Sequence, residues 1–202
     1  MKQPEFLKGI HIGEIIRARM KQCRISDIML AAKMRCTKWA IRTICKQKSI
    51  KINKLIELSY SLEVNFLHVY LKKMTWQENT KPFEDEVIIK IIKEQITLVP
   101  SKRSRTTEFL QSIHIGKLLK MEAKKQNITE KTLSNILYCS QSTVSRIFDS
   151  PDIDTNRLIL MSYKLKYDFI RNIYLPYMAV NENEMSASNW ISDDWIIKIH
   201  RV

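Results

Sequence analysis

Glycine and proline are scarce in this chain. Three Gly and five Pro among 202 residues argue against an all-β or turn-rich architecture, which needs these residues at its many turns, and predict a helical protein. No apolar run approaches the roughly 18 residues that a membrane-spanning helix requires. The N-terminal stretch MKQPEFLKG lacks the apolar core of a secretory signal. We therefore expect a soluble, cytoplasmic protein with no membrane partner.

Cysteine and histidine are also few, and they form no recognisable site. The four Cys include no C-x-x-C pair, and no His follows them at zinc-finger spacing, so free thiols are expected rather than a metal site or disulfides. The four His are scattered, and the chain contains no Gly-rich phosphate loop and no H-E-x-x-H motif. We therefore expect neither an enzyme nor a cofactor, and the short connecting segments leave no room for a small-molecule pocket.

The chain carries a large positive charge. Its 34 Lys and Arg residues outnumber 21 Asp and Glu residues, which gives a net charge of +13 and a pI near 9.6. Such an excess favours a polyanionic partner, usually nucleic acid and less often an anionic membrane surface. Charge alone does not separate these partners from a surface that is basic only for solubility.

One segment is written twice in the chain. Residues 10–16 read IHIGEII, and residues 113–119 read IHIGKLL. With an offset of 103 residues, positions 5–66 align with 108–169 without a gap, and 20 of the 62 aligned pairs are identical, well above chance. Two copies of one unit predict a tandem pair of domains rather than a solenoid, which needs three or more repeats.

The duplication divides the chain into four segments. The apolar tail that follows each copy is rich in β-branched residues and favours a strand, although a helix with Ile88, Ile92 and Ile96 on one face also fits the first tail. The predicted segments are a first domain at 5–74, a connector at 75–107 with its apolar tail at 85–99, a second domain at 108–178, and a connector with the C-terminal apolar tail at 179–202.

Each copy is predicted to fold into five short helices. Apolar residues recur at helical spacing, and Ser26 and Thr37 in the first copy, like Thr129 and Ser140 in the second, are favourable N-caps for the second and third helices. Five helices in about 65 residues, with a very short turn between the second and third, are the layout of a helix-turn-helix DNA-binding domain. A generic helical bundle has the same periodicity, but the short turn, the basic outer face of the third helix and the net charge favour the first interpretation.

The repeated Ile-His-Ile-Gly stands at the entry to the first helix of each copy. Gly13 and Gly116 either let the chain turn into that helix or let it pass close to a neighbouring backbone. His11 and His114 lie beside the helix N-terminus, where a local capping or packing role is favoured over a phosphate contact. We therefore interpret the motif as a marker of the duplicated domain rather than as a functional site.

The segments SDIMLAAKMRCTKWAIRTICKQ and TEKTLSNILYCSQSTVSRIFDS resemble the lambda-repressor-like helix-turn-helix family, of the Cro or xenobiotic-response-element type. The family's small residue of helix two falls at Ala31 and Ser134. The resemblance covers residues 6–74 and 109–178, and the chain is similar to small bacterial regulators found in Bacteroides-like organisms. It implies a mainly α-helical protein of two tandem five-helix domains, which binds double-stranded DNA in a sequence-specific manner and regulates transcription.

One departure from the family's pattern lies in the turn between the second and third helices. Arg35 and Tyr138 stand where the family often has glycine. The sequence therefore leaves open whether the turn keeps its usual geometry.

The resemblance also implies which residues of the third helix contact DNA. A helix-turn-helix lays this helix in the major groove, where side chains near its N-terminus meet base edges. Gln suits adenine, Arg suits guanine and Ser suits either, whereas Trp39 fits a thymine methyl, a sugar or a protein interface. The implied base contacts are Lys38, Trp39, Arg42 and Thr43 in the first copy and Gln141, Ser142, Ser145 and Arg146 in the second.

Phosphate contacts supply most of the affinity of such an interface. Thr37 and Ser140 head helices whose N-terminal N–H groups favour an anion, and four lysines follow the third helix of the first copy. Any single lysine there is explained more simply as a solvated charge, but four so close together favour a function. The implied phosphate contacts are Thr37, Lys46, Lys48, Lys51, Lys54, Ser140 and Arg157.

The two copies differ in charge. Residues 5–74 hold 15 basic and 5 acidic side chains, whereas residues 108–178 hold 10 basic and 7 acidic ones. The second copy has an aspartate at three positions where the first has Lys or Ser, namely Asp149, Asp152 and Asp154. Because carboxylates repel phosphates, we predict that the first copy binds DNA more strongly, while the second tunes specificity, binds weakly or serves protein contacts.

A competing interpretation is a protein-interaction or antitoxin-like assembly module, in which one or both helix-turn-helix folds do not bind DNA. Trp39 and the additional aspartates of the second copy favour this interpretation. Two joined units also mimic the dimers that the family forms, with half-sites about 34 Å apart. The sequence leaves open whether the chain is a pseudo-dimeric monomer or a homodimer.

Overall fold

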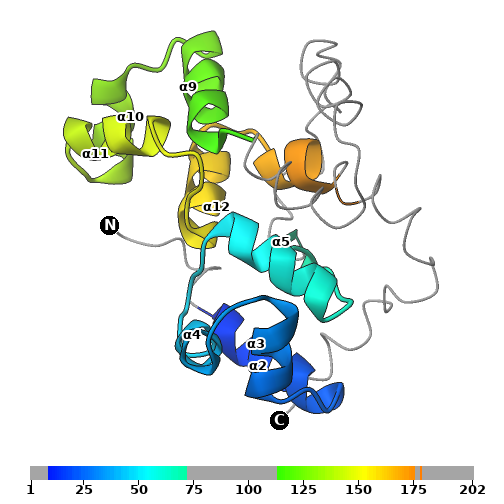
Figure 1. Cartoon of the computed structure of the whole chain (residues 1–202). Coiled ribbons are helices and arrows are strands. Elements are labelled where there is room, and N and C mark those ends of the chain that lie inside the picture. The colour runs from blue at the N-terminus through cyan, green and yellow to red at the C-terminus, as the bar shows by residue number, and fades with distance from the viewer. Residues whose placement is uncertain (1–8, 72–112, 176–177, 179–202) are drawn as a thin grey trace, which may run out of the picture. The chain divides into compact units, whose positions relative to one another are not determined.

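The computed structural model describes residues 9–71, 113–175 and 178, and these residues are mainly α-helical (Figure 1). They form ten helical elements and no β-sheet, which confirms the predicted helical class. None of these helices is both long enough and apolar enough to span a membrane. The tails expected at 85–99 and within 179–202 lie outside the described residues.

The first of two compact units contains five helices from the first copy of the duplicated segment. Their inward faces and the turn before the last helix form a core that includes the fully buried side chains of Ile16, Leu30, Ile41, Leu55 and, in that turn, Phe66. All five lie at positions that the helical spacing predicts to face inward. The helices are α2 (Ile12–Gln22), α3 (Asp27–Lys33), α4 (Lys38–Ile44), α5 (Ile52–Ser61) and α6 (His68–Leu71).

The second compact unit repeats this order with the helices of the second copy. Its core includes the buried Leu119, Leu133, Val144, Leu158 and Phe169, which align with the five core residues named in the first unit. Its last element is a π-helix, where the first copy has a single α-helical turn. The elements are α9 (Ile115–Lys125), α10 (Glu130–Leu137), α11 (Gln141–Phe148), α12 (Thr155–Lys164) and η2 (Ile170–Tyr174).

Side-chain caps open the helices at the predicted positions. Thr37 Oγ1 accepts a hydrogen bond from the backbone N–H three residues on, at 3.1 Å, and Ser140 Oγ does the same at 3.2 Å. Each cap satisfies an N–H group that has no acceptor within its own helix. The same three-residue arrangement caps α2, α3, α9 and α10 through His11, Ser26, His114 and Thr129.

The two glycines of the repeated motif let backbones approach closely. A Cβ atom on Gly13 would lie 2.6 Å from the carbonyl oxygen of Ile44, and a Cβ on Gly116 would lie 2.3 Å from that of Phe148. Their own N–H groups donate to carbonyls just beyond the third helix of the same copy, at 3.0 and 3.1 Å. Neither glycine has a positive φ. The glycines therefore serve close packing rather than a turn.

The turn between the second and third helices is left-handed in both copies although it contains no glycine. Arg35 and Tyr138 have φ values of 49° and 51°, in the region that glycine adopts without steric penalty. Positive φ recurs at two further pairs of equivalent residues, Arg24 with Asn127 and Glu63 with Lys166. The duplication thus extends to the strained positions of the backbone.

Tyr138→Gly is expected to stabilise the second unit by about 0.5–1 kcal/mol. A left-handed residue with a Cβ costs about 1–2 kcal/mol, part of which is cancelled by the greater freedom of glycine in the unfolded chain. The Tyr138 side chain is mostly exposed, so its removal loses little packing. Hydrogen exchange of the α10 and α11 amides measures the gain. Tyr138→Ala keeps the Cβ and should therefore not increase stability. If both variants change stability equally, the left-handed backbone at this position is not strained by the Cβ.

Candidate nucleic-acid interface

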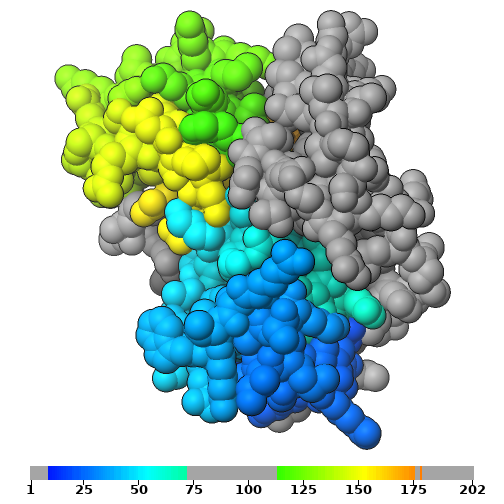
Figure 2. Space-filling model, in the orientation of Figure 1, coloured from blue at the N-terminus to red at the C-terminus, as the bar shows by residue number. Residues whose placement is uncertain are grey.

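Helix α4 turns one side to the core and the other to solvent. Ile41 is fully buried, and the buried Cys45 just beyond the helix lies 3.9 Å, sulfur to sulfur, from Met20 of α2. The opposite side carries side chains three or four residues apart, which therefore share one face. The exposed members are Lys38, Trp39 and Arg42 in α4 and Lys46 in the turn after it, and we refer to these four as the α4 face. The light-blue side chains of this part of the chain lie at the surface in Figure 2.

Three of the four residues predicted to contact bases from the first copy belong to the α4 face. The fourth, Thr43, is half-buried. Trp39 is 74% exposed, so its large apolar ring gains little from the fold of its own unit. An indole held in water beside cations is suited to contact with a partner surface.

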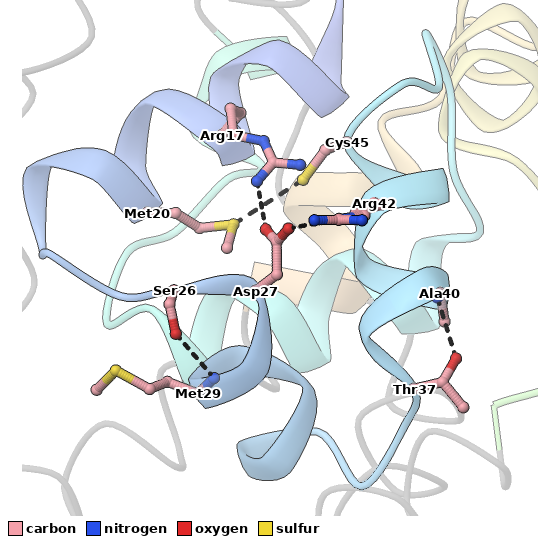
Figure 3. A network of polar contacts seen from close by, with 9 residues as sticks. All are labelled: Arg17, Met20, Ser26, Asp27, Met29, Thr37, Ala40, Arg42 and Cys45. Atoms are coloured by element: carbon pink, nitrogen blue, oxygen red, sulfur yellow. Dashed lines mark hydrogen bonds and ion pairs between the residues drawn. The ribbon is translucent and has the colours of Figure 1, made fainter.

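A carboxylate joins the α4 face to the two preceding helices. Asp27, in the first turn of α3, accepts a hydrogen bond from Arg42 Nε at 3.0 Å, and its other oxygen accepts one from Arg17 of α2 (Figure 3). Burial alone would raise the pKa of Asp27, but the hydrogen bonds from Arg42 and Arg17 outweigh burial and hold the pKa below its ordinary value. Asp27 is therefore ionised at neutral pH and offsets part of the positive charge around Arg42.

Asp27 and Arg17 are candidate functional residues that the sequence reasoning missed. They are distant in sequence from each other and from Arg42, so no helical spacing signals their contact. The second copy offers the one available clue, because Lys120 and Glu130 occupy the equivalent positions and form an ion pair at 3.8 Å. Opposite charges at the same two positions of both copies indicate a contact between the first and second helices.

The predicted phosphate contacts of the first copy lie at the start of α4, in the loop after α4, and in the first turn of α5. Thr37 is exposed, and its hydroxyl oxygen caps α4 while its proton can still be donated. Lys46, Lys48 and Lys51 are exposed. Lys54 is half-buried and forms an ion pair with a carboxylate one turn on, so a phosphate would compete with that carboxylate. Of the four lysines, Lys54 is thus the least suited to contact a phosphate.

The outer face of α11 is polar rather than cationic. The Ser140 hydroxyl that caps this helix lies 2.8 Å from the hydroxyl of Ser142, which ties Ser142 to the start of the helix. The predicted contacts of the second copy are exposed at Ser140, Gln141, Ser142 and Arg146 and half-buried at Ser145 and Arg157.

The outer faces of the two third helices differ in charge in the same direction as the two copies do. The α4 face holds three cations among its four side chains. Where it has these cations, the second copy has Gln141, Ser145 and Asp149, and Asp149 offsets the neighbouring Arg146. A polyanion is therefore attracted to the α4 face much more strongly than to the outer face of α11.

Among the described residues, no three or more His, Cys, Asp or Glu side chains lie together in a way that could hold a metal ion. The four cysteines are free thiols, and burial raises the pKa of the Cys45 and Cys139 thiols, which disfavours the reactive thiolate. The chain matches no protein-family model, no curated protein and no solved structure. Among the described residues, the α4 face is the strongest candidate for a functional surface.

Proposed function

We propose that this protein is a sequence-specific, double-stranded DNA-binding transcriptional regulator. Its two copies act as tandem helix-turn-helix domains of the lambda-repressor-like type, and the third helix of each copy reads the major groove. The observation that carries the proposal is the α4 face, where three cations and an exposed indole lie on the solvent side of α4 and of the turn that directly follows it. This composition suits simultaneous contact with base edges and phosphates.

The arrangement of the second and third helices supports this function. Helices α3 and α4 pack against each other, only residues 34–37 separate them, and α4 begins at a side-chain cap. Helices α10 and α11 repeat the arrangement, with residues 138–140 between them. In a helix-turn-helix the second helix of such a pair enters the major groove, while the first crosses the backbone.

The side chains of the α4 face suit distinct contacts with a duplex. The two Nη groups of Arg42 match O6 and N7 of guanine, Lys38 suits guanine or phosphate, and Trp39 suits a thymine methyl or a sugar. Lys48 extends this cationic surface beyond Lys46 into the loop after α4, and both lysines neutralise flanking phosphates. Each neutralised phosphate releases counterions, so the complex weakens as salt rises.

In this proposal the first unit is the stronger binder, and the second contributes a weaker half-site. Gln141 and Arg146 offer contacts to adenine and guanine, but Asp149 stands where the first unit has Lys46. A carboxylate beside the phosphate backbone repels it. The two units address half-sites about 34 Å apart, either within one chain or in a homodimer.

Selection from randomised duplex oligonucleotides, followed by titration of the enriched duplex at several salt concentrations, tests the proposed function. We expect an enriched sequence and a slope of log affinity against log salt of about −3 to −6, because each neutralised phosphate contributes about −0.9. A scrambled duplex should bind at least about 1,000-fold more weakly. No enriched sequence, with binding no tighter than micromolar, would contradict the proposal.

A protein-interaction or antitoxin-like assembly module is the second candidate function. Three large apolar side chains of the first unit are exposed, namely those of Ile28, Met29 and Trp39, and aromatic residues and Met are enriched in protein interfaces. Failure of the oligonucleotide selection, together with self-association that Trp39→Ser abolishes, would favour this candidate over the first.

A further inference from the structure

The carboxylate of Asp27 lies between two guanidinium groups and is mostly buried, with 15% of its side chain exposed. Figure 3 shows Arg17 of α2 and Arg42 of α4 pointing toward it from different sides. Each carboxylate oxygen takes one arginine, so neither arginine displaces the other. The side chain of Arg42 is nevertheless 56% exposed, so it is held at its inner edge while much of it faces solvent.

An arginine held in this way differs from a solvated one in how it binds DNA. A free Arg side chain has about 2 kcal/mol of rotamer entropy, which a base contact must overcome each time it forms. Arg42 has its Nε engaged by Asp27, which restricts the plane of the guanidinium group and leaves the two Nη groups as the edge that matches guanine. The negative charge of Asp27 also weakens the attraction of Arg42 for phosphates in general.

We propose that Asp27 is a positioning residue that makes the first unit selective for guanine at the base pair contacted by Arg42. Arg17 supports it, because its hydrogen bond to the second oxygen holds the carboxylate in place. This inference rests on the proposed DNA-binding function and goes beyond it. It assigns base selectivity to a side chain on the helix that precedes the recognition helix.

In the second copy no arginine stands at the position equivalent to Arg42, although the opposite charges at the positions of Arg17 and Asp27 are retained. Glu130 and Lys120 stand at the positions of Asp27 and Arg17 and form an ion pair, but Ser145 stands at the position of Arg42. The carboxylate there has no arginine of the recognition helix to hold at that position. The two copies therefore differ in how they select bases as well as in charge.

A double-mutant cycle tests the role of Asp27 on the duplex enriched by the intact protein. The four proteins are the wild type, Asp27→Asn, Arg42→Ala and the double variant, each titrated on duplexes that carry each of the four base pairs at the position where Arg42→Ala loses selectivity. Asp27→Asn is expected to reduce the preference for guanine about tenfold. It should bind the scrambled duplex as well as the wild type does or more tightly, because a negative charge has been removed.

The background of Arg42→Ala separates positioning from a structural role. If Asp27 acts through Arg42, Asp27→Asn changes no base preference once Arg42 is alanine. A loss of equal size in both backgrounds, or an unchanged preference in Asp27→Asn, would overturn the inference. Glu130→Gln is the matched control in the second copy and should leave the preference at this base pair intact.

Two further readouts keep these outcomes interpretable. Hydrogen exchange of the α3 and α4 amides reports whether Asp27→Asn folds, and Asp27→Ser, which places another residue suited to a helix start at this site, replaces it in the cycle if it does not. If the intact protein enriches no sequence, the proposed function itself fails. If it enriches one and the Asp27 variants keep its guanine preference, only the positioning role fails.

Discussion

Replacing Gly13 or Gly116 with alanine is expected to lower the stability of the affected unit by about 1–3 kcal/mol, because neither site has space for a methyl group. The added Cβ would lie 2.6 Å from backbone atoms of Ile44 and Cys45, or 2.3 Å from the carbonyl oxygen of Phe148. Both obstacles are backbone, so the helices themselves must separate. In an unobstructed helix the same substitution stabilises by roughly 0.5–1 kcal/mol, so the expected sign is reversed.

Hydrogen exchange measures this effect separately in each unit. Protection of the α2 and α4 amides should fall about 5- to 150-fold in Gly13→Ala, and that of the α9 and α11 amides should fall similarly in Gly116→Ala. Gly9→Ala is the matched control, because a Cβ there meets nothing within 4 Å, and it should lose no protection. If all three variants behave alike, the glycines do not serve the close approach of the two helices.

Removing two cations of the α4 face, with Lys38→Ala and Arg42→Ala together, is expected to weaken binding to the enriched duplex at least about 100-fold. A good bidentate base contact contributes about 1–3 kcal/mol of discrimination, and each lost cation also reduces the attraction to phosphate. Removing the two longest predicted base-contacting side chains of the second unit, with Gln141→Ala and Arg146→Ala together, should weaken binding about tenfold or less. Fluorescence anisotropy at one fixed salt concentration compares the variants.

A control for charge alone is available in the first unit. Lys21→Ala with Arg24→Ala also removes two positive charges, but from the end of α2 and the turn that follows it. A solvated charge outside the contact surface acts only through screened long-range attraction. The affinity of this variant for the enriched duplex should therefore fall about threefold or less. A larger loss from the α11 pair than from the α4 pair would reverse the predicted ranking of the two units.

The helix starts could be predicted because their signals are local. Ser26 and Thr37 are capping residue types, and each accepts the N–H three residues on, as expected. A cap and an apolar stripe depend only on residues three or four apart, so a single sequence contains all the information that they need.

Side-chain contacts between helices could not be predicted from the sequence pattern, even by comparing the two copies. In the first copy Arg19 donates to the carbonyl of Leu62 at 3.2 Å. In the second copy the equivalent carbonyl, that of Leu165, accepts from Gln126 at 2.6 Å instead. The two donors are not equivalent in the alignment. A backbone acceptor at the end of a helix has to be satisfied, but packing decides which nearby side chain reaches it.

The sequence by itself determined the helical class, the duplication, the caps, the buried stripes and the outward, basic face of the third helix in the first copy. Only the tertiary structure decided that Gly13 and Gly116 allow two backbones to meet, that Arg35 and Tyr138 take up a left-handed turn without glycine, and that Asp27 holds Arg42. The first group depends on neighbours along one helix. The second depends on which helices pack together and how closely, because a side chain finds its partner across that packing and no sequence period records it.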